Sequence, residues 1–124
     1  MKKKKILIIE DEKMLREMYQ DKLCRENFEV ISVDSAEEGI KIIPKEKPNL
    51  ILLDILLPKA NGLDFMEWFK KEKKFSAIPI IAFSNYDEPS AKKEALRLGV
   101  KDYLIKTNYT PKEIVIKIKK YLKK

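Results

Sequence analysis

Five polar residues in this sequence have types and positions that suit binding of a cation and a phosphoryl group. Each follows or ends an apolar run: Glu10, Asp11, Asp54, Ser84 and Lys106. Carboxylates brought close together repel one another unless a cation neutralises them, and Mg²⁺ prefers hard oxygen ligands of this kind. A lysine and a hydroxyl at the same place could then bind phosphate oxygens.

Asp54 is the strongest of these candidates. It lies among leucines and isoleucines between Leu50 and Leu57, where a carboxylate is unfavourable unless a partner neutralises it. An aspartate that begins a turn is the ordinary alternative. The other four residues also have ordinary explanations when taken singly, as a solvated acidic turn before a helix or as loop residues. Their joint placement after successive apolar runs is what favours a site.

Residue types that are missing or rare exclude several kinds of chemistry. The chain has no histidine, which excludes Ser-His-Asp and Cys-His catalysis and most zinc sites. Cys24 is the only cysteine, so neither an internal disulfide nor a multi-cysteine metal site is available. We expect Cys24 to be a small core residue on a helix.

Length and charge bound the remaining possibilities. The 124 residues fit one domain, residues 1–124, and we expect no separate output domain. The net charge of +7 is spread over Lys2–Lys5, Lys70–Lys74 and Lys117–Lys124, with few aromatics interleaved, which disfavours specific nucleic-acid binding. The apolar runs are too short to span a membrane or to form a signal peptide, so we expect a cytoplasmic protein.

Apolar runs and helical patterns alternate along the chain. The expected strands cover Lys5–Ile9, Phe28–Val33, Leu50–Leu53, Ile78–Phe83 and Asp102–Ile105. The expected helices cover Lys13–Asn27, a segment that opens at Ser35 and is closed by Pro44 and Pro48, Leu63–Lys74, a segment from Pro89 to Gly99, and a segment that starts at Thr110. In the first helix, the expected apolar stripe is Met14, Leu15, Met18, Leu23 and Cys24.

This alternation favours an α/β fold in which helices cover both faces of a parallel sheet. Sites in such sheets lie beyond the carboxyl ends of the strands. Each of the five polar residues follows or ends an expected strand, so the pattern predicts that they meet at one edge of the sheet.

The arrangement resembles the response-regulator receiver domain of two-component signalling, in particular the single-domain chemotaxis regulators. The likeness extends over essentially the whole chain. It rests on Glu10-Asp11, on Asp54 within Leu-Leu-Asp-Ile-Leu-Leu-Pro, and on Pro58, Gly62, Ser84, Tyr103 and Lys106. The resemblance implies a flavodoxin-like, doubly wound sheet of five parallel strands in the order 2-1-3-4-5, with five helices.

The resemblance also implies a function. Asp54 would accept a phosphoryl group from a sensor histidine kinase or a phosphotransfer protein, while Ser84 and Lys106 bind its oxygens. Magnesium would be held by Asp11, Asp54 and the backbone carbonyl of Leu56, with assistance from Glu10. Such a domain assists its own phosphorylation and dephosphorylation but is not otherwise an enzyme.

The output implied by the resemblance is a surface change. Ser84 and Tyr103 would act as the switch and alter the surface of the fourth helix, fifth strand and fifth helix, which then contacts a downstream target protein. The domain would be a monomer or a weak dimer.

Three positions depart from the usual pattern of the family. Glu10 stands where many relatives have Asp, Asn85 where small residues are preferred, and Thr107 where Pro usually follows a cis peptide bond. A cis bond before a non-proline residue costs about 3 kcal/mol, so either the loop is strained or Lys106 is presented differently.

Two alternatives stay open. One, suggested by these departures, is a receiver fold that binds partners without being phosphorylated. The other is a phosphohydrolase with an aspartate nucleophile, although the second acid expected in such sites is replaced by Leu56.

Overall fold

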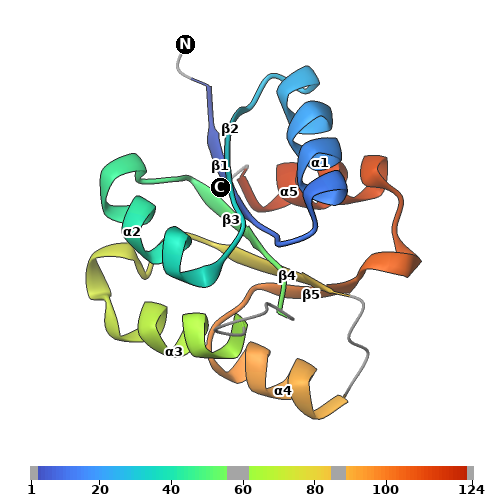
Figure 1. Cartoon of the computed structure of the whole chain (residues 1–124). Coiled ribbons are helices and arrows are strands. Elements are labelled where there is room, and N and C mark those ends of the chain that lie inside the picture. The colour runs from blue at the N-terminus through green and yellow to red at the C-terminus, as the bar shows by residue number, and fades with distance from the viewer. Residues whose placement is uncertain (1–2, 56–61, 85–88, 123–124) are drawn as a thin grey trace.

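The computed structural model describes residues 3–55, 62–84 and 89–122, together with the side chains of all of these except residues 62 and 63. Its strands are β1 (Lys5–Ile9), β2 (Glu29–Val33), β3 (Leu50–Leu53), β4 (Ile80–Ser84) and β5 (Asp102–Ile105). They form one parallel sheet in the order β2-β1-β3-β4-β5 (Figure 1). The predicted sheet and strand order are therefore confirmed.

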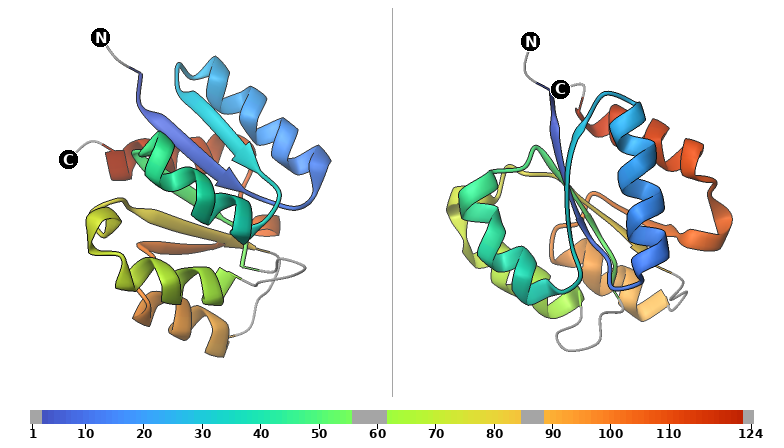
Figure 2. Two further views of the ribbon diagram at one scale, coloured as in Figure 1. Left: turned by 60° about the vertical axis from the view of Figure 1, so that its left-hand side comes forward. Right: turned by 45° about the horizontal axis from the view of Figure 1, so that its top comes forward.

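The helices lie on both faces of this sheet (Figure 2). They are α1 (Lys13–Arg25), α2 (Ala36–Glu46), α3 (Gly62–Lys71), α4 (Pro89–Arg97) and α5 (Pro111–Leu122), with short 3-10 turns at Lys73–Phe75 and Lys106–Asn108. Successive strand residues point to opposite faces, so each face has its own apolar core. One core joins Ile6 and Ile8 to α1 and α5, and the other joins Leu7 and Ile9 to α2, α3 and α4.

The strand register aligns the carboxyl ends of the strands at one edge. Ile9 lies opposite both Val33 and Leu53, and Ser84 lies opposite Ile105. The Asp54 amide donates a hydrogen bond of 2.9 Å to the Ile9 carbonyl. The residues that follow β1 and β3 are therefore adjacent, as the parallel arrangement requires.

Two predicted helix starts are confirmed by side-chain hydrogen bonds. The Ser35 hydroxyl accepts a bond of 3.2 Å from the Glu38 amide at the start of α2. At the start of α5, the Glu113 amide donates to the Thr110 hydroxyl at 3.2 Å, and the Thr110 amide donates to the Glu113 carboxylate at 2.8 Å. This reciprocal pair is a capping box, which fixes where α5 begins after β5.

The second helix ends between the two prolines that were expected to close it. Pro44 lies inside α2, which continues to Glu46 and ends at Lys47 in a left-handed conformation (φ 47°). The Lys47 amide still bonds to the Ile43 carbonyl at 2.8 Å. A proline inside a helix removes one amide donor and crowds the preceding turn, and the packing of buried Ile43 offsets this cost. The third helix is shorter than expected and gives way to the first 3-10 turn.

The expected apolar stripe of the first helix was only partly right. Leu23 is buried and Leu15 packs against the core, but Met14 is 81% exposed and Cys24 is exposed, so Cys24 is not a core residue. Tyr19, four residues before Leu23, completes the buried face of α1. Several stripes of this helix have helical spacing, and the packing of Tyr19 against the sheet decides which one is buried.

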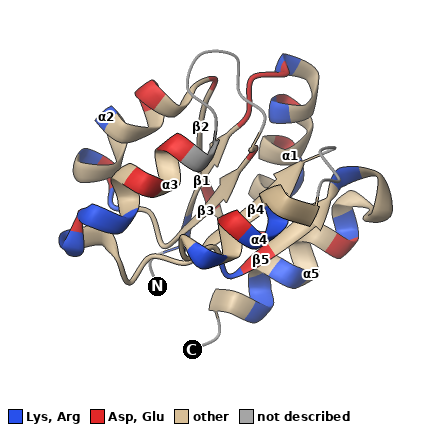
Figure 3. Cartoon of the chain, turned by 90° about the horizontal axis from the view of Figure 1, so that it is seen from below, with Lys and Arg blue, Asp and Glu red and all other residues tan. Residues whose placement is uncertain are grey.

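The charged residues of the described surface are not gathered on one element. In the view from below, Lys and Arg are distributed over several helices (Figure 3). Among the described helices, none combines the length and the apolar character that crossing a membrane requires.

Candidate functional site

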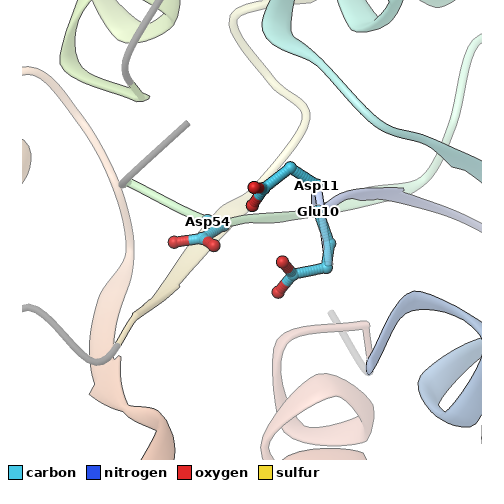
Figure 4. Close-up of side chains that lie close together, drawn as sticks. All are labelled: Glu10, Asp11 and Asp54. Carbon is cyan, nitrogen blue, oxygen red and sulfur yellow. The ribbon is translucent and has the colours of Figure 1, made fainter. Parts of the chain in front are cut away.

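Three carboxylates meet at the carboxyl ends of β1 and β3. Glu10, Asp11 and Asp54 each offer an oxygen, and these oxygens all lie within 4.8 Å of one another (Figure 4). Glu10 and Asp54 are buried, with 0% and 4% of their surface exposed, whereas Asp11 is exposed. The predicted convergence of these acids is therefore present, and one side of the cluster faces solvent.

Lys106 joins this cluster from the end of β5. Its Nζ lies 2.6 Å from Glu10 Oε1 and 3.1 Å from Asp54 Oδ2, and only 9% of its side chain is exposed. Lys106 therefore ion-pairs with two of the three acids. Buried charges need such pairing, because an isolated ion away from water is strongly unfavourable.

The environment shifts the proton affinities of this pair. Burial raises the pKa of Glu10 above its ordinary value, although the hydrogen bond from Lys106 opposes that shift. Burial alone would lower the pKa of Lys106, but the hydrogen bond to Glu10 and the charge of Asp54 outweigh it and raise that pKa. Lys106 is therefore charged at neutral pH, and its ammonium favours the ionised form of Glu10 against the effect of burial.

The segment between β1 and α1 is held by its own hydrogen bonds. The Glu12 amide donates to Glu10 Oε2 at 2.9 Å. The Arg16 guanidinium donates to the backbone carbonyls of Glu10 at 2.9 Å and Asp11 at 3.4 Å. Arg16 was not among the predicted site residues. It is the only arginine near the acidic pair in the sequence, and its position one turn into α1 is the signal that could have indicated its role.

Ser84 and Tyr103 lie on neighbouring strands beside the cluster. Ser84 is fully buried at the end of β4, opposite Ile105, the residue before Lys106. Tyr103 is 5% exposed and packs in the core that includes α4. Both are placed next to the site's strands, and their roles in switching stay predictions.

One departure from the family pattern, the Thr107 that follows Lys106, can be compared with the structure. No peptide bond in the described segments is cis, so the Lys106–Thr107 bond is trans and begins the second 3-10 turn. Lys106 is thus presented by a turn without Pro after it. Leu56, Pro58 and Asn85 lie outside the described residues.

Two aromatic residues near the site were missed by the sequence predictions. The Lys106 Nζ lies 4.9 Å from the centroid of the Phe83 ring, and Tyr19 packs at right angles to that ring. An aromatic residue directly before Ser84 was the available signal. Taken alone, an aromatic residue at that position indicates only a buried strand residue.

The donor set fits a hard divalent cation. Three carboxylates with one exposed member supply oxygen ligands while leaving room for water or phosphate oxygens, as Mg²⁺ requires. Lys106 adds a positive charge 3.1 Å from Asp54 Oδ2. The arrangement can therefore bring an ammonium group and a cation to one anionic acceptor.

Comparison with known proteins identifies a family. Residues 6–119 match the model described as "Response regulator receiver domain". The chain is 35% identical over 124 residues to "Probable transcriptional regulator ycf27" of Porphyridium aerugineum, which covers 100% of this chain and 50% of that protein. The chain spans about half the length of the curated relatives it matches.

Solved structures show the same fold. A putative response regulator from Chloroflexus aurantiacus superposes with a TM-score of 0.90 at 28% identity, covering 99% of this chain and 100% of that one. A response regulator receiver domain protein from Methanospirillum hungatei, described as CheY-like, gives a TM-score of 0.90 at 30% identity, covering 98% of this chain and 94% of that one.

Proposed function

The chain belongs to the response regulator receiver domain family, and on this premise we propose that Asp54 accepts a phosphoryl group and that Asp11, Asp54 and Glu10 hold Mg²⁺ beside it. The observation that carries the proposal is the meeting of these three carboxylates with Lys106 at one sheet edge. The backbone carbonyl of Leu56 completes the proposed ligand set.

The residues of this site act by position and charge. Asp54 presents a carboxylate oxygen to the phosphorus of a phosphohistidine on a sensor kinase or phosphotransfer protein. The P–N bond breaks as the P–O bond forms, and the imidazole leaves with the electron pair and takes a proton. Bound Mg²⁺ would neutralise charge on the donor and acceptor oxygens. No general base is needed, which suits a chain without histidine.

Lys106 and Ser84 bind the transferred group in this proposal. The Lys106 ammonium, 3.1 Å from Asp54 Oδ2, is already close to where new phosphoryl oxygens would form. Its bond to Glu10 must give way for it to reach them, and Mg²⁺ held by the three carboxylates would supply the compensating charge for Glu10. The Ser84 hydroxyl would donate to another phosphoryl oxygen from the end of β4.

The proposed output is a change of surface. A phosphoryl group at Asp54 draws Ser84 and its neighbours inward, and buried Tyr103 responds by changing its packing next to α4. The faces of α4, β5 and α5 then bind a target protein. The curated relatives named as transcriptional regulators are about twice as long, so in them further chain accompanies a segment of this kind.

A phosphoryl analogue separates this function from phosphorylation-independent binding. We expect beryllofluoride with Mg²⁺ to shift amide resonances of β4, α4 and β5 in the wild type and to shift none of them in Asp54→Asn. If the two proteins gave the same spectra with and without beryllofluoride, a constitutive binding module would be the better description. The family match does not favour the phosphohydrolase alternative.

A further inference from the structure

The Lys106 ammonium lies next to an aromatic ring. Phe83, the last residue before Ser84 on β4, has no exposed surface, and its ring centroid lies 4.9 Å from the Lys106 Nζ. An ammonium within about 6 Å of a ring centroid is attracted by the negative face of the ring, and the attraction strengthens when the site excludes water. Lys106 thus has three partners: two carboxylates and one ring.

A second ring fixes the orientation of the first. Tyr19 on α1 lies 5.3 Å from Phe83 between centroids, with the two planes at 87°. Such an edge-to-face pair is a favourable arrangement of aromatic quadrupoles. Tyr19 is 3% exposed and belongs to the same core as Phe83, so α1 restrains the ring beneath Lys106.

Unlike the two carboxylates, the Phe83 ring takes no part in binding the cation or the phosphoryl group. This inference rests on the proposed function. Glu10 and Asp54 are shared between Lys106 and the proposed cation and phosphoryl sites, so their hold on the ammonium weakens whenever those sites fill. Phe83 binds no metal and accepts no phosphoryl group. Its attraction for the ammonium therefore remains available in every state.

We propose that Phe83, oriented by Tyr19, is a positioning residue that keeps the Lys106 ammonium beside Asp54 while the carboxylates are engaged by other cations. A leucine at position 83 would keep an apolar side chain in the core but would provide no negative face. Without the ring, the released ammonium would swing toward solvent on its flexible stem and would reach phosphoryl oxygens less often.

The contact itself is tested on the protein alone, by NMR. In the wild type, the Lys106 ε-methylene protons should be shifted upfield by the Phe83 ring current, with the resonance assigned by its loss in Lys106→Met. In Phe83→Leu the shift should disappear. A Lys106 ε-methylene resonance at the position shared by exposed lysines in the wild type would overturn the proposal, whatever the domain's function.

The consequence is tested by beryllofluoride affinity in the presence of Mg²⁺. Phe83→Leu should weaken binding by about 2- to 30-fold, the range expected for a cation–π contact of a desolvated ammonium. Phenylalanine with one or three ring fluorines at position 83 preserves the shape of the ring but reduces the negative charge density of its face. Beryllofluoride affinity should fall with one fluorine and fall further with three.

The control is the same series in Lys106→Met. In that background, the variants with fluorinated Phe83 should all bind beryllofluoride with the same affinity, because no ammonium remains to be positioned. A purely structural role would lower the thermal midpoint of Phe83→Leu but would give no graded effect of fluorination and no dependence on Lys106, and that pattern would overturn the proposal. Failure of the wild type itself to bind beryllofluoride would count against the proposed function, while the ring-current shift would still decide the contact.

Discussion

Glu10 and Lys106 are 96 positions apart in the sequence, yet Lys106 Nζ lies 2.6 Å from Glu10 Oε1, and the Glu10 side chain has no exposed surface. The lysine is the only cationic side chain that the described residues show paired with this carboxylate. Its ammonium neutralises the same two carboxylates, Glu10 and Asp54, that a bound metal ion would neutralise. Lysine and metal are therefore expected to compete.

Removing the lysine should reveal this competition. Lys106→Met leaves Glu10 and Asp54 close together without a cation, and loss of one partner of a buried pair costs about 3 kcal/mol. We expect its free energy of unfolding in metal-free buffer to fall by about that amount, and its Mg²⁺ affinity to exceed that of the wild type. Both are measurable by urea titration, with and without Mg²⁺.

The matched control is Lys101→Met, an exposed lysine at the opposite end of β5. It should change neither stability nor Mg²⁺ affinity appreciably. Equal behaviour of the two variants would show that the pair with Glu10 contributes nothing.

Alkaline pH should remove the same interaction. Pairing raises the pKa of Lys106 in the folded state above the ordinary lysine value of 10.5. The stability that the charged Lys106 contributes is thus fully present below pH 10.5 and is lost as pH rises through the raised pKa. Burial also raises the pKa of Tyr19 above 10.0, which acts in the same direction. Urea midpoints measured from neutral to strongly alkaline pH should show the gap between wild type and Lys106→Met narrowing; a constant gap would refute the assignment.

Gly39 provides a test of the packing around Ile9, the residue before Glu10. A Cβ at this position in α2 would lie 2.6 Å from Ile9 Cδ1 and 3.3 Å from Ile9 Cγ1. Alanine gains about 1 kcal/mol of helix propensity over glycine, but overpacking a core costs about 1–3 kcal/mol. We expect Gly39→Ala to lower the free energy of unfolding by about 1 kcal/mol.

The control for that substitution is Ile9→Val, which removes the clashing Cδ1. In the Ile9→Val background, Gly39→Ala should be neutral or stabilising, so the two changes should be non-additive in a double-mutant cycle. Additive effects would mean that Ile9 moves away freely.

The capping box of α5 should contribute measurably as well. Thr110→Ala removes the hydroxyl that accepts the Glu113 amide and should cost about 1 kcal/mol in urea unfolding. Thr107→Ala, an exposed threonine in the preceding turn, should be close to neutral. A neutral Thr110→Ala would indicate that packing of Ile114 and Ile118 alone determines where α5 starts.

The sequence pattern was sufficient to predict the parallel sheet and the gathering of the acids at one edge, whereas the strand order was implied by the resemblance to receiver domains. Parallel strands place their carboxyl ends at the same edge of a sheet, so the residues that follow β1, β3 and β5 lie along one edge. An acid amid leucines, as at Asp54, is also costly enough to stand out. These inferences depend on periodicity and topology, which are properties of the sequence pattern.

The features that the sequence could not predict depend on tertiary packing. The position of the α2 end between Pro44 and Pro48 depends on the packing of buried Ile43, which local rules do not include. Cys24 was predicted to be a core residue because several stripes of α1 have helical spacing, and only contact with the sheet selects Tyr19 beside Leu23. The Phe83–Lys106 contact joins two strands through side-chain directions that no local pattern specifies.

The central claim is that Asp54 accepts the phosphoryl group, and intact-mass measurement after treatment with acetyl phosphate and Mg²⁺ tests it most directly. The wild type should gain the mass of one phosphoryl group, and the gain should vanish without Mg²⁺ and in Asp54→Asn. Asp64→Asn, which removes a carboxylate outside the cluster, should be modified like the wild type. An Asp54→Asn protein that is modified as fully as the wild type, or a wild type that gains no mass, would contradict the account.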